Sequence, residues 1–285
     1  MLNQKLLNAG DTASRSLVRG DRQGASRLLP VRPGKSPSRV GRPGVTAPET
    51  VLQSFNTWAF KREQPADPQL MLHIIGEAIA QAKPVPFVLY WGKGPRSGLD
   101  EPDTTCLDYL SALTRRVCAA YEGGAAVKLI FTDTHADLNG HSAEGMRNYF
   151  GSIEAEARQR GFDSCWLGEL VRNAAVIAED RADDAVPPDT LERLSACAAK
   201  WYRGEGTPEQ GAAKYFQMNM IEKRAVEHAF PRSIFITFNG SEYRSLFPEA
   251  LPIFYMYSLR RGVSVKPWFL PTVVAPSVVE RAVQA

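Results

Sequence analysis

Residues 127–137 read VKLIFTDTHAD, an apolar run that stops abruptly in polar side chains. The apolar residues between Val127 and Phe131 suit a short strand that is buried on both faces of a sheet. The polar residues from Thr132 to Asp137 then crowd hydrogen-bonding and titratable groups onto the carboxyl end of that strand, where open α/β sheets bind their ligands. This stretch therefore predicts both a central strand and the edge of the sheet that carries the active site.

The composition is that of an ordinary globular protein with ample apolar material for a core. The chain has 285 residues, of which 44% are hydrophobic and 23% are charged. No apolar run approaches the roughly 18 to 20 residues that a membrane-spanning helix needs. The amino terminus also lacks the apolar region of a signal peptide. We therefore expect a cytoplasmic protein with no membrane partner.

The first 48 residues differ from the rest in charge. They hold nine Lys/Arg against Asp11 and Asp21, a balance of +7, so the remainder carries 3 − 7 = −4. They contain no aromatic residue and become rich in Pro, Gly, Ser and Arg after residue 30, a composition that cannot bury enough apolar surface to order itself. We predict a disordered basic arm over 1–48 and a single α/β catalytic domain over 49–285. The arm could solubilise the protein, join the subunits of a homodimer, or hold RNA or an acidic partner.

The spacing of apolar residues gives alternating strands and helices. The expected helices are 50–60, 68–82, 107–121, 142–160, 189–202 and 212–229, and 162–177 is ambiguous but helical from Trp166. The expected strands are 86–91, 127–131, 234–238, 252–257 and 263–269. In 252–257 the two-fold alternation of Ile253, Tyr255 and Tyr257 suggests one less buried face. The order predicts a Rossmann-like α/β fold with a mostly parallel central sheet and flanking helices.

The expected helix 212–229 should bury one face. The residues on that face are Tyr215, Met218, Ile221, Ala225 and His228.

The four cysteines are scattered without a C-x-x-C pair, so we expect free thiols that are mostly buried.

The first group of candidate catalytic residues follows the strand 127–131. Asp133, His135 and Asp137 bring two carboxylates within two residues of a histidine, and a neighbouring carboxylate can set the tautomer of such a general acid or base. The alternative is an aspartate that caps the following loop beside a solvated histidine. Together with His141 the group could also offer metal ligands, although no tetrahedral motif is complete and we expect no metal.

The second group follows the strand 86–91. Lys93 is a candidate catalytic residue, and Tyr90, Arg96 and Ser97 are candidate substrate contacts. Glycines at 92 and 94 let backbone N–H groups approach an anion that the two cations neutralise, so a phosphate or carboxylate fits. An ordinary basic turn is the alternative.

Two further groups lie near the carboxyl end of the chain. Glu242, Tyr243 and Arg244 follow an apolar strand and are candidate substrate contacts, with a plain Asn-Gly turn as the alternative. Trp268 is a candidate stacking platform, although a tryptophan in this setting more often belongs to the core.

Between Lys83 and Phe269 the chain resembles the isocyanide (isonitrile) synthase family associated with pyoverdine and dityrosine biosynthesis. The similar pieces, in order, are KPVPFVL at 83–89 with KGP at 93–95, FTD at 131–133 with ADL at 136–138 and Gly140, Tyr149, FPRSI at 230–234, and KPW at 266–268. The chain departs from the family at Thr134-His135, Asn239-Gly240 and Phe269, where the family has Gly-Arg, His-Pro and His.

The resemblance implies a Rossmann-like enzyme that needs no metal or other cofactor. Such an enzyme joins the amine of an amino acid to a carbon donated by ribulose 5-phosphate. A weaker resemblance points to tRNA-dependent cyclodipeptide synthases, which use aminoacyl-tRNA, through Asp133 to Asp137, Ser142-Ala143 and Glu242-Tyr243. Against the second family, helix 142–160 balances its arginines with glutamates and lacks a basic face, and no serine nucleophile stands in a Gly-x-Ser context. A non-catalytic binding protein is the third hypothesis. An enzyme predicts that Lys93, His135 and Tyr243 converge on one cleft.

Overall fold

The computed structural model describes residues 47–92, 94–175, 185–238, 240–241 and 250–256. The predicted arm over 1–48 and the predicted strand 263–269 lie outside these residues, apart from the last two positions of the arm. No described helix is both long enough and apolar enough to span a lipid bilayer.

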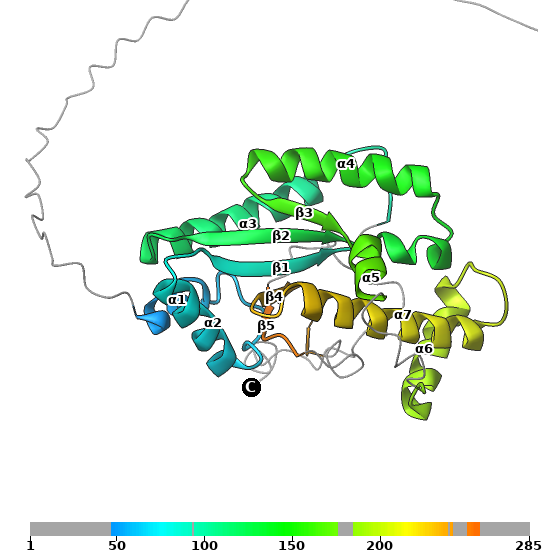
Figure 1. The fold of residues 1–285 in the computed structure, drawn as a ribbon. Helices are drawn as coiled ribbons and strands as arrows, with labels where there is room; N and C mark the ends of the chain where they lie inside the picture. The colour runs from blue at the N-terminus through cyan, green and yellow to red at the C-terminus, as the bar shows by residue number, and fades with distance from the viewer. Residues whose placement is uncertain (1–46, 93, 176–184, 239, 242–249, 257–285) are drawn as a thin grey trace, which may run out of the picture. The chain divides into compact units, whose positions relative to one another are not determined.

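The described residues form one sheet of five parallel strands in the order β3-β2-β1-β4-β5. Figure 1 shows them in this order from top to bottom. Their bounds are β1 Val85–Trp91, β2 Ala125–Phe131, β3 Asp163–Trp166, β4 Ile234–Thr237 and β5 Ile253–Tyr255. The order 3-2-1-4-5 is that of doubly wound, Rossmann-like sheets, and it confirms the predicted fold class.

Side chains of each strand alternate between two apolar layers. Phe87, Leu89 and Trp91 face one layer, whereas Val88 and Tyr90 face the other. The first layer also contains apolar residues of α1 Pro48–Phe55, α2 Pro68–Ala80, α3 Glu101–Ala120 and α4 Ala143–Gln159. The second contains residues of α5 Leu167–Ala175 and α7 Pro208–Ala229. The sheet is therefore buried on both faces, which explains the nearly continuous apolar runs of β1 and β2.

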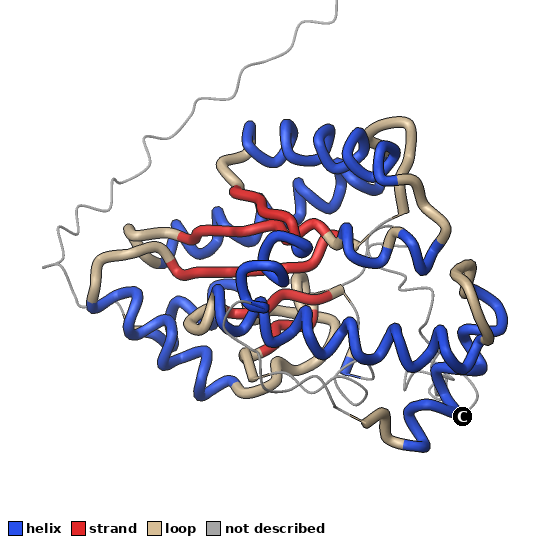
Figure 2. Tube along the Cα trace, turned by 45° about the vertical axis from the view of Figure 1, so that its right-hand side comes forward, coloured by secondary structure: helices blue, strands red, loops and turns tan. Residues whose placement is uncertain are grey.

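Local sequence signals set where most helices begin. Proline occupies the first turn of α1, α2, α3, α7 and α6 Pro188–Trp201, where its missing N–H costs no hydrogen bond. Ser142 caps α4, and reciprocal side-chain bonds between Thr207 and Gln210 cap α7. A similar pair, Asp100 and Asp103, caps α3, and because of these caps α3 and α7 begin several residues before the apolar periodicity that predicted them. Helix α6 packs along α7, and Figure 2 shows the pair extending from the sheet.

The segment 162–177 is helical from Leu167, one residue from the expected start. The strand β3 that precedes this helix was not predicted, because a four-residue strand is too short to show a period. One expectation about the strands is wrong. The expected less buried face of β5 is absent, since Ile253, Phe254 and Tyr255 are all buried. The chain around Lys61 to Ala66 runs antiparallel beside this edge strand and bridges to it, which covers the edge. Tyr257 lies outside the described residues.

The four cysteines are free thiols, but only Cys106 and Cys197 are buried. Cys165 is half-buried and Cys118 is exposed. The expectation of mostly buried thiols therefore holds for two of the four.

Candidate functional site

The carboxyl ends of three strands are level with one another. Trp91 of β1 pairs with Phe131 of β2, which pairs with Trp166 of β3. The residues that follow these strands therefore share one edge of the sheet, as the sequence predicted for the first two. Thr132 donates hydrogen bonds from its backbone N–H and its hydroxyl to the carbonyl of Trp91, each at 3.2 Å. The two polar turns after β1 and β2 are thus held directly against each other.

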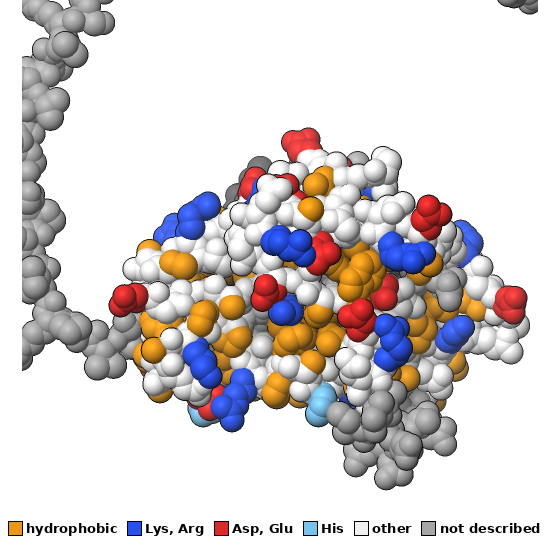
Figure 3. Space-filling model, turned by 45° about the horizontal axis from the view of Figure 1, so that its top comes forward, with side chains coloured by type: hydrophobic (Ala, Val, Ile, Leu, Met, Phe, Trp, Pro, Cys, Tyr) orange, Lys and Arg blue, Asp and Glu red, His pale blue; other side chains and the backbone are white. Residues whose placement is uncertain are grey.

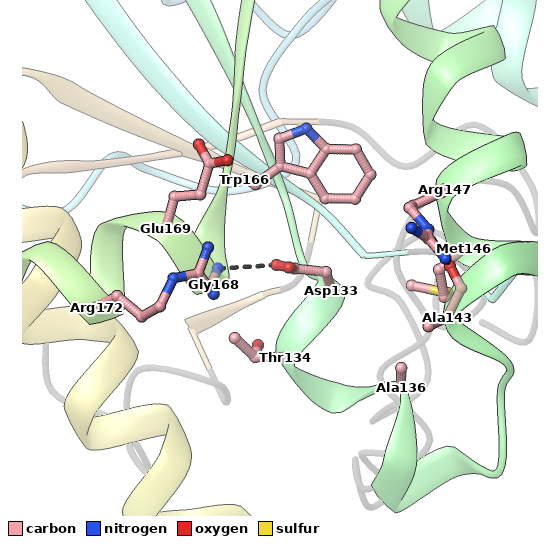
Figure 4. Close-up of a pocket in the computed structure, with 10 residues that line it drawn as sticks. All are labelled: Asp133, Thr134, Ala136, Ala143, Met146, Arg147, Trp166, Gly168, Glu169 and Arg172. Carbon is pink, nitrogen blue, oxygen red and sulfur yellow. Dashed lines mark hydrogen bonds between the residues drawn. The ribbon is translucent and has the colours of Figure 1, made fainter.

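A pocket of about 740 Å³ lies beyond the ends of β2 and β3. It is bounded by the turn after β2, the start of α4 and the start of α5, and Figure 4 shows its lining side chains. These are Asp133, Thr134, Ala136, Ala143, Met146, Arg147, Trp166, Gly168, Glu169 and Arg172. The volume is typical of small-molecule sites, which span roughly 300–1,000 Å³.

Asp133 stands between the two helices that wall this pocket (Figure 4). Its Oδ1 accepts a hydrogen bond of 2.8 Å from the backbone N–H of Gly168, in the first turn of α5. A carboxylate is favoured there because the first N–H groups of a helix have no intrahelical partner. A Cβ at position 168 would lie 2.7 Å from Oδ2 of Asp133, so only glycine lets the carboxylate come this close. Asp133 therefore caps α5 and not the loop that follows it, as the alternative had it, and the same side chain also lines the pocket.

Three more charged side chains line the pocket: Arg147 on α4, and Glu169 and Arg172 on α5. The Nε of Arg147 donates to the carbonyl of Ala143 in its own helix, at 3.3 Å. Within the described part of the chain, the side chains of Glu169 and Arg172 form no hydrogen bond or ion pair, and Arg147 forms no ion pair. The pocket thus combines two cations and two anions that are available to a ligand.

Trp166 forms a rigid apolar wall of the pocket. Its ring meets Phe131 edge-on at 5.6 Å between ring centroids and Phe150 at 5.5 Å. Because these contacts fix the indole from the core side, its orientation is set before any ligand arrives.

His135 is buried and points toward α7 instead of lining the pocket. Its Nε2 lies 2.8 and 2.9 Å from the two carboxylate oxygens of Glu222, a residue that is only 2% exposed. The hydroxyl of Thr134 donates to the same carboxylate, and the ring of Tyr215 meets His135 edge-on at 5.1 Å. Burial raises the pKa of Tyr215, and the nearby charge of Glu222 adds to that rise. The alternative of a solvated histidine is therefore wrong.

The buried face of α7 also differs from the expected one. Ile221 is 44% exposed and His228 is exposed, whereas Asn219, Glu222 and Lys223 are buried. The polar residues could have been found in the sequence only by noticing that Tyr215, Asn219, Glu222 and Val226 follow the spacing of one helix face.

The described candidate residues in and before the turn after β1 do not line the pocket, although the composition of the turn suggested a ligand site. Arg96 forms an ion pair with Asp100, the residue that caps α3, and Ser97 is exposed. Tyr90 packs its ring edge-on against Phe235 at 5.1 Å, in the layer on the α5 and α7 side of the sheet. None of these three candidates lines the pocket, and Lys93 lies outside the described residues.

A buried hydrogen-bond chain supports the end of β1. Nε1 of Trp91 donates to the hydroxyl of Tyr149 at 3.3 Å, and this hydroxyl donates to Oδ1 of Asp103 at 2.9 Å. Asp103 is fully buried, and its other oxygen accepts from the backbone N–H of Asp100. Burial is the main reason that the pKa of Tyr149 is raised. The chain ties α3 and α4 to the last residue of β1.

Several candidate residues stay predictions. Glu242, Tyr243, Arg244 and Trp268 lie outside the described residues, and of Asp137 only the backbone, in a short 3-10 turn, is described. The convergence of Lys93, His135 and Tyr243 is for this reason untested. Among the described residues, no cluster of His, Cys, Asp and Glu could hold a metal ion.

Comparison with known proteins supports the fold. No protein-family model matches the chain, and no curated protein matches it. Among solved structures, the PvcA protein from Pseudomonas aeruginosa superposes with a TM-score of 0.56 at 16% identity, over 78% of this chain and 87% of that one. Tyrosyl-tRNA synthetases from Archaeoglobus fulgidus and Leishmania major match with TM-scores of 0.42 and 0.36, each at 12% identity. They cover 74% and 75% of this chain and 64% and 37% of their own. Of these three structures, PvcA alone superposes closely enough to bear on the fold.

Proposed function

We propose that this chain is a small-molecule biosynthetic enzyme, similar to isocyanide synthases, that acts on the amine of an amino acid or a derivative. The proposal rests on the pocket at the carboxyl edge of the sheet, with Asp133 at its centre. The sequence resemblance to isocyanide synthases and the fold-level similarity to PvcA support the same class of enzyme. In this proposal residues 49–285 act as one catalytic domain.

We assign to Asp133 the binding and deprotonation of the substrate amine. Its Oδ1 is held by Gly168, whereas its Oδ2 accepts no hydrogen bond from a described residue. An ammonium group bound at Oδ2 would lose a proton to the carboxylate, after which its lone pair could attack a carbonyl carbon. The C–N bond forms in that step, and water leaves as the C=N bond of an imine forms. Ribulose 5-phosphate is the carbonyl donor that the family resemblance suggests.

His135, Asp137 and Lys93 remain our candidates for the later proton transfers. The Glu222 contact occupies Nε2 of His135, so Nδ1 is the nitrogen left for a proton transfer, which would have to reach the pocket through an intervening group because the ring does not line it. Tyr90, Arg96, Ser97, Glu242, Tyr243, Arg244 and Trp268 remain proposed substrate contacts.

The test is to incubate the purified protein with an amino-acid mixture and ribulose 5-phosphate, and separately with charged tRNAs, while mass spectrometry follows the products. We expect turnover in the first mixture and a loss of at least about 100-fold in Asp133→Asn, because general acid–base catalysis contributes that much. Asp163→Asn is the matched control, since Asp163 is exposed at the opposite end of β3. Full activity of Asp133→Asn would remove Asp133 from the mechanism.

Turnover only with charged tRNA would instead support the cyclodipeptide synthase alternative, and binding without turnover would support a non-catalytic binding protein. The charges on the described residues argue against tRNA binding. At the carboxyl end of α4, Arg158 pairs with Glu154, and the C-cap residue Arg160 pairs with Glu156 and Asp108. Figure 3 shows one face, on which basic and acidic side chains are interspersed and form no continuous basic patch.

A further inference from the structure

The charges that line the pocket are more numerous than a simple amino acid requires. One ammonium and one carboxylate would satisfy one anion and one cation of the protein. The pocket presents Asp133 and Glu169 as anions and Arg147 and Arg172 as cations, and none of the four is in an ion pair within the described part of the chain. One arginine and one carboxylate, that of Glu169 if Asp133 holds the amine, are therefore left over, and the arginine can bind a second acidic group.

The two arginines come from different walls of the pocket. Arg147 belongs to α4 and Arg172 to α5, and in Figure 4 they stand on opposite sides of Asp133. Two arginines at the carboxyl end of α4 behave differently, since Arg158 in its last turn and Arg160 at its C-cap are each paired with the glutamate four residues earlier. Arginine binds carboxylate and phosphate through two parallel N–H···O bonds, so each of the two can hold one such group.

The position of Asp133 sets where the amine lies between the two acidic groups. The volume of about 740 Å³ leaves room for a ligand larger than a free monocarboxylic amino acid. We propose that the pocket binds two acidic groups at once, one on Arg147 and one on Arg172, with an amine at Asp133. The second acidic group is a carboxylate or a phosphate, either on the amino-acid substrate itself or on its co-substrate. This inference rests on the proposed function.

Calorimetric titration of the full chain tests the inference without requiring turnover. The probes are L-alanine, with one acidic group, and O-phospho-L-serine, which adds a second. We expect O-phospho-L-serine to bind at least about tenfold more tightly than L-alanine, the gain of one charge-assisted hydrogen-bonded pair. Arg147→Gln and Arg172→Gln should each reduce this preference to less than about threefold, and Arg158→Gln, the control on the outer face of α4, should retain it.

Titration of inorganic phosphate into the protein saturated with L-alanine separates the two sources of the second acidic group. Phosphate binding beside L-alanine, lost in one of the two arginine variants, would indicate a separate phosphorylated co-substrate, and the inference would stand. Absence of phosphate binding, together with the preference for O-phospho-L-serine, would place both acidic groups on one substrate. Equal affinities for L-alanine and O-phospho-L-serine, or a preference that survives both arginine substitutions, would overturn the inference. Turnover of monocarboxylic amino acids without this preference would reject only the inference, whereas the preference without any turnover would reject only the proposed function.

Discussion

Replacement of His135 by alanine should strongly destabilise the protein. The imidazole Nε2 lies 2.8 Å from one carboxylate oxygen of Glu222, and Glu222 is 2% exposed. Loss of one partner from a buried pair leaves the other charge poorly compensated and costs about 3–5 kcal/mol. The hydroxyl of Thr134 still donates to Glu222 in the variant, so we expect the lower end, about 3 kcal/mol.

Urea unfolding, followed by far-UV circular dichroism, measures the free energy of unfolding in a double-mutant cycle. The variants are His135→Ala, Glu222→Ala and the double replacement. Because the two side chains contact each other directly, the double variant should lose about 1–3 kcal/mol less than the sum of the single losses. Lys128→Ala is the control: its partner Asp163 is mostly exposed, and such surface pairs contribute about 1 kcal/mol or less.

Additive losses would refute this reasoning, because they would show that His135 and Glu222 do not interact in solution. A change in the m-value, the slope of the unfolding free energy against urea concentration, would point instead to an altered unfolded or native state. Stability losses no larger than that of Lys128→Ala would show that Glu222 is hydrated and not buried.

Two further predictions concern other buried groups. Tyr149→Phe removes the hydroxyl that donates to the fully buried Asp103, and should cost about 1–3 kcal/mol in the same urea assay; no loss would mean that Asp103 finds another donor. Cys118 is exposed and should react with a disulfide reagent at about pH 8 well before Cys165, as peptide mass mapping would show. Burial raises the pKa of Cys165 to about 11, so its thiol stays protonated and unreactive at that pH. Labelling of Cys118 and Cys165 at the same rate would contradict the burial of Cys165.

Apolar periodicity predicted the sheet and most helices because burial on two faces leaves a strong pattern. In β1 the residues on both faces are apolar, and the polar turn that follows marks where the strand ends. The failures share a cause, since the deciding contacts are distant in sequence. The four residues of β3 are a strand only because they pair with β2, and β5 is covered only because residues 61–66 cross its edge.

The candidate site was predicted in part for the same reason. Asp133 stands at a strand end, so its place at the edge of the sheet followed from the sequence. The role of Gly168 could not be foreseen, because it depends on α5 bringing its first turn to within 2.8 Å of that carboxylate. Arg147 and Arg172 are unremarkable in sequence, since each lies on a helix among other charged residues. Glu222 was missed because a lone glutamate in a helix is usually solvated.

The strand order adds a constraint on how a second substrate would reach the amine. In a sheet of order 3-2-1-4-5, ligands are expected in the crevice between the ends of β1 and β4, where the order reverses. The pocket around Asp133 lies instead at β2 and β3. Neighbouring strands are about 4.8 Å apart, so the end of β2 is roughly 7 Å from the middle of that crevice. A co-substrate bound in that crevice would therefore have to extend past the end of β1 to reach an amine held at Asp133. Residues that follow β1 in the sequence, Lys93 among them, are for this reason the ones to replace first if the two substrates prove to bind separately.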